Sequence, residues 1–93
     1  MIGAPQDSEI SQEDRDLVNN CKAQINAKCG GNYESFDIVK AKSQVVAGTN
    51  KFYHLNANPG NKALTAQIFV PLPHTNEAPS VSQCSEGHNA LQQ

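Results

Sequence analysis

The sequence lacks the features on which several large classes of protein depend. No apolar run approaches the roughly twenty residues that a membrane-spanning helix needs. The seven basic residues are spread along the chain and are outnumbered by nine acidic ones, so no basic patch is available for nucleic acid. The amino terminus has neither the basic segment nor the apolar core of a signal peptide. We therefore expect no nucleic-acid partner, no membrane partner and no export signal.

Cysteine is also scarce. Its three positions, Cys21, Cys29 and Cys84, form an odd set without a C-x-x-C pair, which argues against a disulfide framework and against a closed zinc site. No Asn-x-Ser/Thr glycosylation acceptor is present. The sequence therefore predicts a cytoplasmic protein whose thiols act mostly as small buried hydrophobes in a reducing compartment.

Motifs for catalysis and cofactor binding are missing as well. There is no G-x-S-x-G, no phosphate-binding loop and no metal-ligand spacing, so we expect no cofactor, no metal and no enzyme. An enzyme would have to combine a cysteine with a histidine from the set Cys29, Cys84, His54, His74 and His88. Cys29 falls at the end of a predicted helix, where the negative end of the helix dipole disfavours the thiolate. Catalysis is therefore the weaker interpretation.

The 93 residues are enough for a single domain, 1–93, with a modest core. Residues 1–7 are predicted to form a flexible arm, because Gly3 and Pro5 prevent an early helix. One long helix is predicted over about residues 9–28. Ser11 and Asp14 have the spacing of a capping box, and Gly30 is the natural left-handed cap. Apolar residues follow at helical intervals in between.

After residue 32 the apolar period changes from 3.6 to 2, which predicts strands. Four are expected, at about residues 34–46, 50–57, 63–70 and 80–86. Asn58-Pro59-Gly60-Asn61 supplies turn chemistry between the second and the third. One helix followed by antiparallel strands indicates an α+β domain in which a four- to five-stranded sheet covers the apolar stripe of the helix.

The connection between the first two strands is unusual. It carries Gln44-Val45-Val46-Ala47-Gly48, although a hairpin turn is usually polar. Valines at such a tip are expected either to close a buried strand end or to contact another molecule.

Three segments together resemble a known family. Gly3, the run 42–50 with the sequence KSQVVAGTN, and Leu72-Pro73-His74 occur in the order and approximate spacing of the stefins, the unsecreted single-domain cystatins. The resemblance covers nearly the whole chain and implies the cystatin fold, a sheet wrapped around one long helix. One departure is Cys84, which stands where stefins usually have an aromatic residue.

The resemblance implies tight, reversible and competitive inhibition of papain-like cysteine proteases, of the cathepsin L, S, H and B class, by a wedge that enters the active-site cleft. Val45 and Val46 would lie against apolar walls of the cleft, Ala47 and Gly48 would keep the backbone close, and Gln44 would brace the loop. Two further parts would complete the wedge. They are the second loop, Leu72, Pro73 and His74, and the arm, Met1, Ile2 and Gly3.

Alternatives remain open at this point. The arm could be a simple terminus, the valines a strand end and Leu72 a core residue. A cystatin-fold protein could also act as a scaffold that binds no protease. A third possibility is that the protein is active as a monomer and also forms an inactive domain-swapped dimer. In that dimer the loop 45–48 would open, and the first strand and the helix would exchange between two chains.

Overall fold

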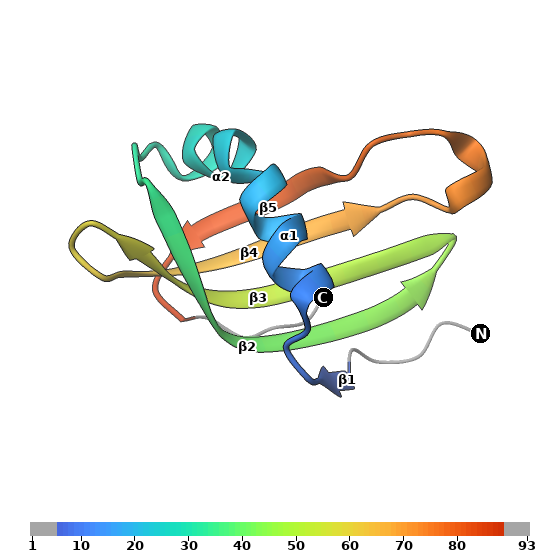
Figure 1. The fold of residues 1–93 in the computed structure, drawn as a ribbon, viewed down its shortest axis with the longest axis horizontal. Helices are drawn as coiled ribbons and strands as arrows, with labels where there is room; N and C mark the ends of the chain where they lie inside the picture. Colours follow the sequence, from blue (N-terminus) through green and yellow to red (C-terminus); the bar gives the residue numbers. More distant parts are fainter. Residues whose placement is uncertain (1–5, 89–93) are drawn as a thin grey trace.

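The computed structural model describes residues 6–88 and contains one antiparallel sheet with helices on one face (Figure 1). The strands lie side by side in chain order: β1 (Gln6–Ser8), β2 (Ser35–Val46), β3 (Gly48–Asn58), β4 (Lys62–Val70) and β5 (Ser80–Glu86). The helical elements are α1 (Gln12–Asn20), α2 (Lys22–Cys29) and the short 3-10 helix η1 (Pro73–Thr75). This arrangement confirms the predicted α+β class with a four- to five-stranded sheet.

The alternation predicted for the central strands is confirmed. Tyr53, Leu55 and Ala57 on β3 are fully buried, and they face the helices together with Leu64 and Ile68 of β4. Most of their neighbours along the strands are more exposed, as expected for a sheet with helices on one face, although Phe52 on the opposite face of β3 is also buried. The core therefore lies between β3, β4 and the helical layer.

The helix is interrupted, which differs from the single helix predicted over residues 9–28. Cys21 separates α1 from α2 with backbone angles φ −94° and ψ 9°, although hydrogen bonds from Cys21 N to Leu17 O and from Ile25 N to Cys21 O continue across the break. Two asparagines, whose side chains compete for backbone hydrogen bonds, precede Cys21. The result is a bend that lays α1 across the sheet and α2 over β5 (Figure 1).

Both ends of the helical layer are capped by the residues that the sequence predicted. Asp14 N donates to Ser11 Oγ, and Ser11 N donates to Asp14 Oδ2, which completes the predicted capping box. At the other end Gly30 has φ 70° and ψ 28°, the left-handed conformation in which glycine is least strained. Local chemistry therefore fixes where the helical layer begins and ends.

Part of the predicted arm belongs to the sheet. Gln6 and Asp7 pair with Ser43 and Lys42 of β2 as the edge strand β1. Residues 1–5 lie outside the described residues. The arm predicted for residues 1–7 is thus shortened at its inner end, because the backbone of β2 offers an unpaired edge there.

The expectation of three free thiols is wrong. Cys29 and Cys84 form a disulfide that joins the end of α2 to β5, with Cα atoms 5.4 Å apart. The odd number of cysteines concealed this pair, because only tertiary packing brings the two positions together. Cys21 is the one free cysteine, and it is buried in the core as expected for a small hydrophobe.

Candidate functional site

The two connections that the sequence singled out lie at the same end of the sheet (Figure 1). Strands β2 and β3 pair as far as Val46 opposite Gly48, so Ala47 alone forms the turn. On the next strand Val70 pairs with Thr49, and the chain then enters the β4–β5 connection. We call Val45, Val46, Ala47, Leu72, Pro73 and His74 the tip surface.

Apolar side chains of the tip surface face solvent. Val45 has an exposed fraction of 74% and Leu72 one of 39%, and both rank among the exposed large hydrophobic residues of the described chain. Among the residues 44–48 and 71–74, His74 is the only one that can carry a charge. Such a surface can recognise an apolar groove by packing, but it offers little for ionic recognition.

The second loop is held in shape by its own hydrogen bonds. Thr75 N donates to Leu72 O over 3.1 Å, and Thr75 Oγ1 donates to the same oxygen over 2.7 Å. Asn76 closes the 3-10 turn in a left-handed conformation, with its N–H donating to Pro73 O. Leu72 is therefore presented from an ordered turn, which lowers the entropy lost when a partner binds.

Gln44 lies in the stem of the hairpin and not at its apex. Its side chain has an exposed fraction of only 8%, and Asn50 Nδ2 on the paired position of β3 donates to Gln44 Oε1 over 3.5 Å. This position suits the bracing role predicted for Gln44.

Gly48 is required by the fold itself, a reason that the sequence did not reveal. Its φ of 124° lies in a region that L side chains rarely adopt, and a Cβ there would come within 2.7 Å of Val70 O and 2.8 Å of Phe69 Cζ. The Phe69 ring thus packs against the tip, which also accounts for an aromatic residue on the face of β4 that points away from the helices. No local pattern in the sequence marks this contact, because it joins two different strands.

A buried carboxylate at the start of α1 was not predicted as a tertiary contact. Asp14 has an exposed fraction of 3%, and its Oδ1 accepts a hydrogen bond of 2.6 Å from the Tyr53 hydroxyl and lies 3.6 Å from Lys51 Nζ. Burial raises the pKa of Asp14, but the hydrogen bonds from Tyr53 and Ser11 and the Lys51 charge outweigh burial and hold the pKa below its usual value. For Tyr53, burial and the adjacent carboxylate raise the pKa. The pair therefore ties the first turn of α1 to the centre of β3.

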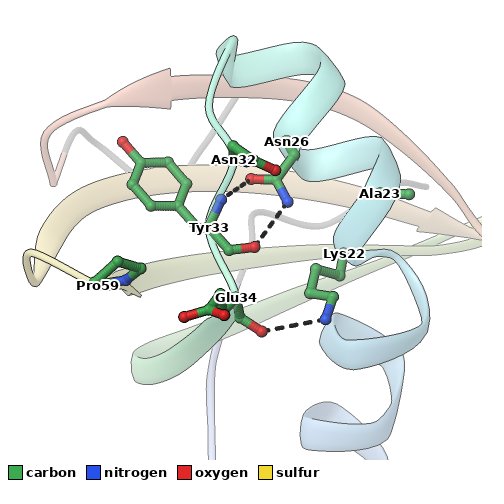
Figure 2. A pocket seen from close by; sticks show the side chains of 7 residues that line it. All are labelled: Lys22, Ala23, Asn26, Asn32, Tyr33, Glu34 and Pro59. Carbon is green, nitrogen blue, oxygen red and sulfur yellow. Dashed lines mark hydrogen bonds between the residues drawn. The ribbon is translucent and has the colours of Figure 1, made fainter.

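A cavity of about 560 Å³ lies at the other end of the molecule (Figure 2). Its polar groups already hold the loop after α2. The Asn26 side chain donates to Tyr33 O and accepts from Tyr33 N, and Lys22 Nζ donates to Glu34 O (Figure 2). These contacts assign the cavity lining a structural role in joining α2 to the start of β2.

The alternative of a cysteine–histidine enzyme loses its nucleophiles, because Cys29 and Cys84 are bonded to each other. His54 alternates with the buried Tyr53 and Leu55, so it points to the face of the sheet away from the helices, where its ring stacks on His88 at 4.7 Å. Across residues 6–88 no group of three or more His, Cys, Asp or Glu side chains could hold a metal ion. In the same range, no helix is long and apolar enough to cross a membrane.

Of the predicted site residues, the structure brings together the hairpin apex and the second loop at one end of the sheet. The third predicted part, Met1, Ile2 and Gly3, lies outside the described residues.

Comparison with known proteins gives a family match over most of the chain. A family model described as the cystatin domain matches residues 3–85. Mouse cystatin-B is 31% identical over 83 residues, which cover 88% of this chain and 84% of that protein. The pig protein named leukocyte cysteine proteinase inhibitor 1 is 32% identical over 72 residues, which cover 77% of this chain and 69% of that protein.

A solved structure shares the fold. It is described as a secreted type 1 cystatin from Fasciola hepatica, and it superposes with a TM-score of 0.64 over 95% of this chain and 98% of that chain. The sequence identity is 21%, so this match supports the fold alone.

Proposed function

Because the chain belongs to the cystatin family, whose members are protease inhibitors and not enzymes, we propose that it is a reversible, tight-binding and competitive inhibitor of papain-like cysteine proteases. The proposed targets are the cathepsin-type enzymes of the L, S, H and B class. The name of the pig relative as a cysteine proteinase inhibitor supports the same kind of target.

The exposure of Val45 is the observation that carries this proposal. A valine with an exposed fraction of 74% stands two residues before the turn of a paired hairpin, where it buries little apolar area within the monomer. Leu72 adds a second apolar side chain at the same end of the sheet. Together they suit a groove with apolar walls, such as the substrate-binding cleft of a papain-like protease, because burying apolar area there is favourable.

The proposed mechanism is steric and involves no bond to the protease. The hairpin apex and the 72–74 loop would fill the cleft beside the catalytic cysteine, and no scissile peptide would need to reach it. Met1 and Ile2 would occupy substrate-side subsites, and Gly3 would let the chain turn away. An interface of about 1,600 Å² in total would be ordinary for a specific complex. The monomer is the proposed active form.

Binding to a chemically blocked protease tests this mechanism. A papain-like protease whose catalytic cysteine is carboxymethylated should still bind the protein, although more weakly, because the plug does not use the thiol. Calorimetric titration of blocked and unblocked protease measures both constants. Loss of all binding to the blocked protease, together with a covalent adduct to the unblocked one, would contradict a non-covalent plug.

The disulfide indicates the kind of compartment in which the protein functions. A cytoplasmic protein would keep Cys29 and Cys84 reduced, whereas disulfides persist in oxidising compartments. We propose that the disulfide-bonded form works in an oxidising compartment, in place of the cytoplasm predicted from the cysteine count. Alkylation of free thiols at lysis, followed by mass spectrometry of the Cys29 and Cys84 peptides, distinguishes the two locations.

A further inference from the structure

The connection between β4 and β5, residues 71–79, is fixed at both of its ends (Figure 1). At its start, Val70 is still paired with β3. At its other end, the side chain of Gln24 on α2 donates to Pro79 O over 3.4 Å and accepts from Val81 N over 3.0 Å. The two ends are therefore held by neighbouring elements, and the shape of the loop between them depends on contacts within the loop.

The Thr75 side chain lies at the centre of those contacts. Its Oγ1 donates to Leu72 O over 2.7 Å and accepts from Glu77 N over 3.4 Å. The backbone N–H of Thr75 donates to Leu72 O as well, over 3.1 Å. Thr75 thus uses its hydroxyl both as a donor and as an acceptor, and it links the two sides of the 3-10 turn η1.

This arrangement limits how Leu72 can be recognised. Its carbonyl already accepts two hydrogen bonds from Thr75, and neither Pro71 nor Pro73 has a backbone N–H. A segment that binds as an added strand needs free main-chain donors and acceptors. The loop is therefore unsuited to strand-like pairing with a partner, and its contribution depends on where the partly exposed Leu72 side chain is held.

We propose that Thr75 is a positioning residue for inhibition, because its hydroxyl keeps the 72–74 loop in the binding conformation before the protease arrives. This role rests on the proposed function. Thr75 acts through Leu72, and it does not need to touch the protease. Without the hydroxyl, only a fraction of the molecules would have a competent loop, and the apparent affinity would fall by that fraction.

The kinetics of binding distinguish positioning from direct contact. The bound complex is the same with or without the Thr75 hydroxyl, so the dissociation rate constant stays unchanged. The association rate constant falls, because fewer free molecules present a competent loop. A side chain that contacts the protease behaves differently, since its loss mostly speeds dissociation.

Two variants of the full chain test the hydroxyl. Thr75→Val removes the hydroxyl and keeps the branched shape of the side chain, whereas Thr75→Ser keeps the hydroxyl. For Thr75→Val we expect the inhibition constant for papain to rise roughly 3- to 10-fold, the usual effect of losing one hydrogen bond. The rise should come from slower association in progress curves, and Thr75→Ser should restore the wild-type constant.

Thr65→Val is the matched control. It removes a hydrogen bond of the same length, from Thr65 Oγ1 to Gly87 O over 2.7 Å, in the part of β4 far from the tip surface. Its inhibition constant should equal that of the wild type. Leu72→Ala is the control for a direct contact, and it should speed dissociation.

Loop order is measured on the free protein, so this readout does not depend on inhibition. In nitrogen-15 relaxation, the order parameters of the His74, Thr75 and Asn76 amides should fall from about 0.85 in the wild type to below about 0.6 in Thr75→Val. The melting temperature of Thr75→Val should stay within about 4 °C of the wild-type value, because the side chain is exposed.

The outcomes separate this inference from the proposed function. If the wild type inhibits papain competitively and Thr75→Val inhibits equally well, the positioning role is wrong and the proposed function stands. Faster dissociation of Thr75→Val, or unchanged order parameters, would also overturn the positioning role. If the wild type does not inhibit papain at all, both proposals fail.

Discussion

The Tyr53 hydroxyl donates a 2.6 Å hydrogen bond to Asp14 Oδ1 inside the core, between the first turn of α1 and the centre of β3. Both side chains are almost fully buried, and Lys51 is the cation beside them. An acidic residue that the sequence predicted as part of the capping box is therefore also a tertiary contact. It holds the start of the helix against the strand that leads to the tip surface.

The stability contributed by Asp14 depends on pH. Its pKa in the folded protein is below the ordinary value of 3.8, so its contribution is fully present above that value and is lost as the pH falls towards the folded pKa. We expect Asp14→Asn to lower the free energy of unfolding by about 1–3 kcal/mol at pH 7. The difference from the wild type should shrink below pH 3.8.

Urea denaturation at several pH values measures this difference. Glu13→Gln is the matched control, because it removes an exposed carboxylate from the same helical turn. An equal loss of stability in both variants, or a loss for Asp14→Asn that does not change with pH, would show that the buried contact contributes nothing specific.

Gly48→Ala is expected to destabilise the hairpin tip by about 2 kcal/mol or more. The added methyl group would meet Val70 O and the Phe69 ring, and the backbone would be strained as well. Gly60→Ala separates these causes, since Gly60 also has a positive φ of 101° but no atom within 4 Å of the added Cβ. Thermal unfolding of both variants should show the larger loss for Gly48→Ala, and equal losses would remove the packing argument.

The disulfide is expected to be a large part of the stability. It closes a loop with a sequence separation of 55, for which the chain-entropy estimate is about 4 kcal/mol. Reduction should therefore lower the melting temperature by roughly 16–32 °C, as followed by circular dichroism. Cys21→Ala, which leaves the disulfide in place, is the control for effects of the reductant on the free thiol. An unchanged melting temperature would mean that the crosslink restricts the unfolded chain very little.

The parts of the fold that the sequence predicted are those set by local chemistry. Gly30 could be recognised as a helix cap, and the alternation of Tyr53, Leu55 and Ala57 identified the buried face of β3, because neither depends on distant residues. The break at Cys21 and the pairing of Gln6 with Ser43 could not be predicted, because tertiary contacts decide them.

In the candidate site, too, local features could be predicted from the sequence and tertiary contacts could not. An apolar run at a hairpin apex is visible in the sequence, and the exposure of Val45 agrees with it. The packing of Phe69 against Gly48 and the bond between Cys29 and Cys84 join residues from different strands and helices. No local pattern marks such pairs, and three cysteines without a repeat leave the pairing open.

Competitive inhibition is the central claim, and two valines of the same strand test it most directly. Val45 near the apex and Val39 near the bulge of β2 are both exposed, at 74% and 49%, but only Val45 belongs to the tip surface. We expect Val45→Asp to raise the inhibition constant for papain by roughly 30-fold or more, because a charge would enter an apolar cleft. Val39→Asp should leave the constant unchanged, with both variants folded by circular dichroism. Equal constants for Val45→Asp and the wild type, or no competitive inhibition by the wild-type monomer, would contradict the proposed function.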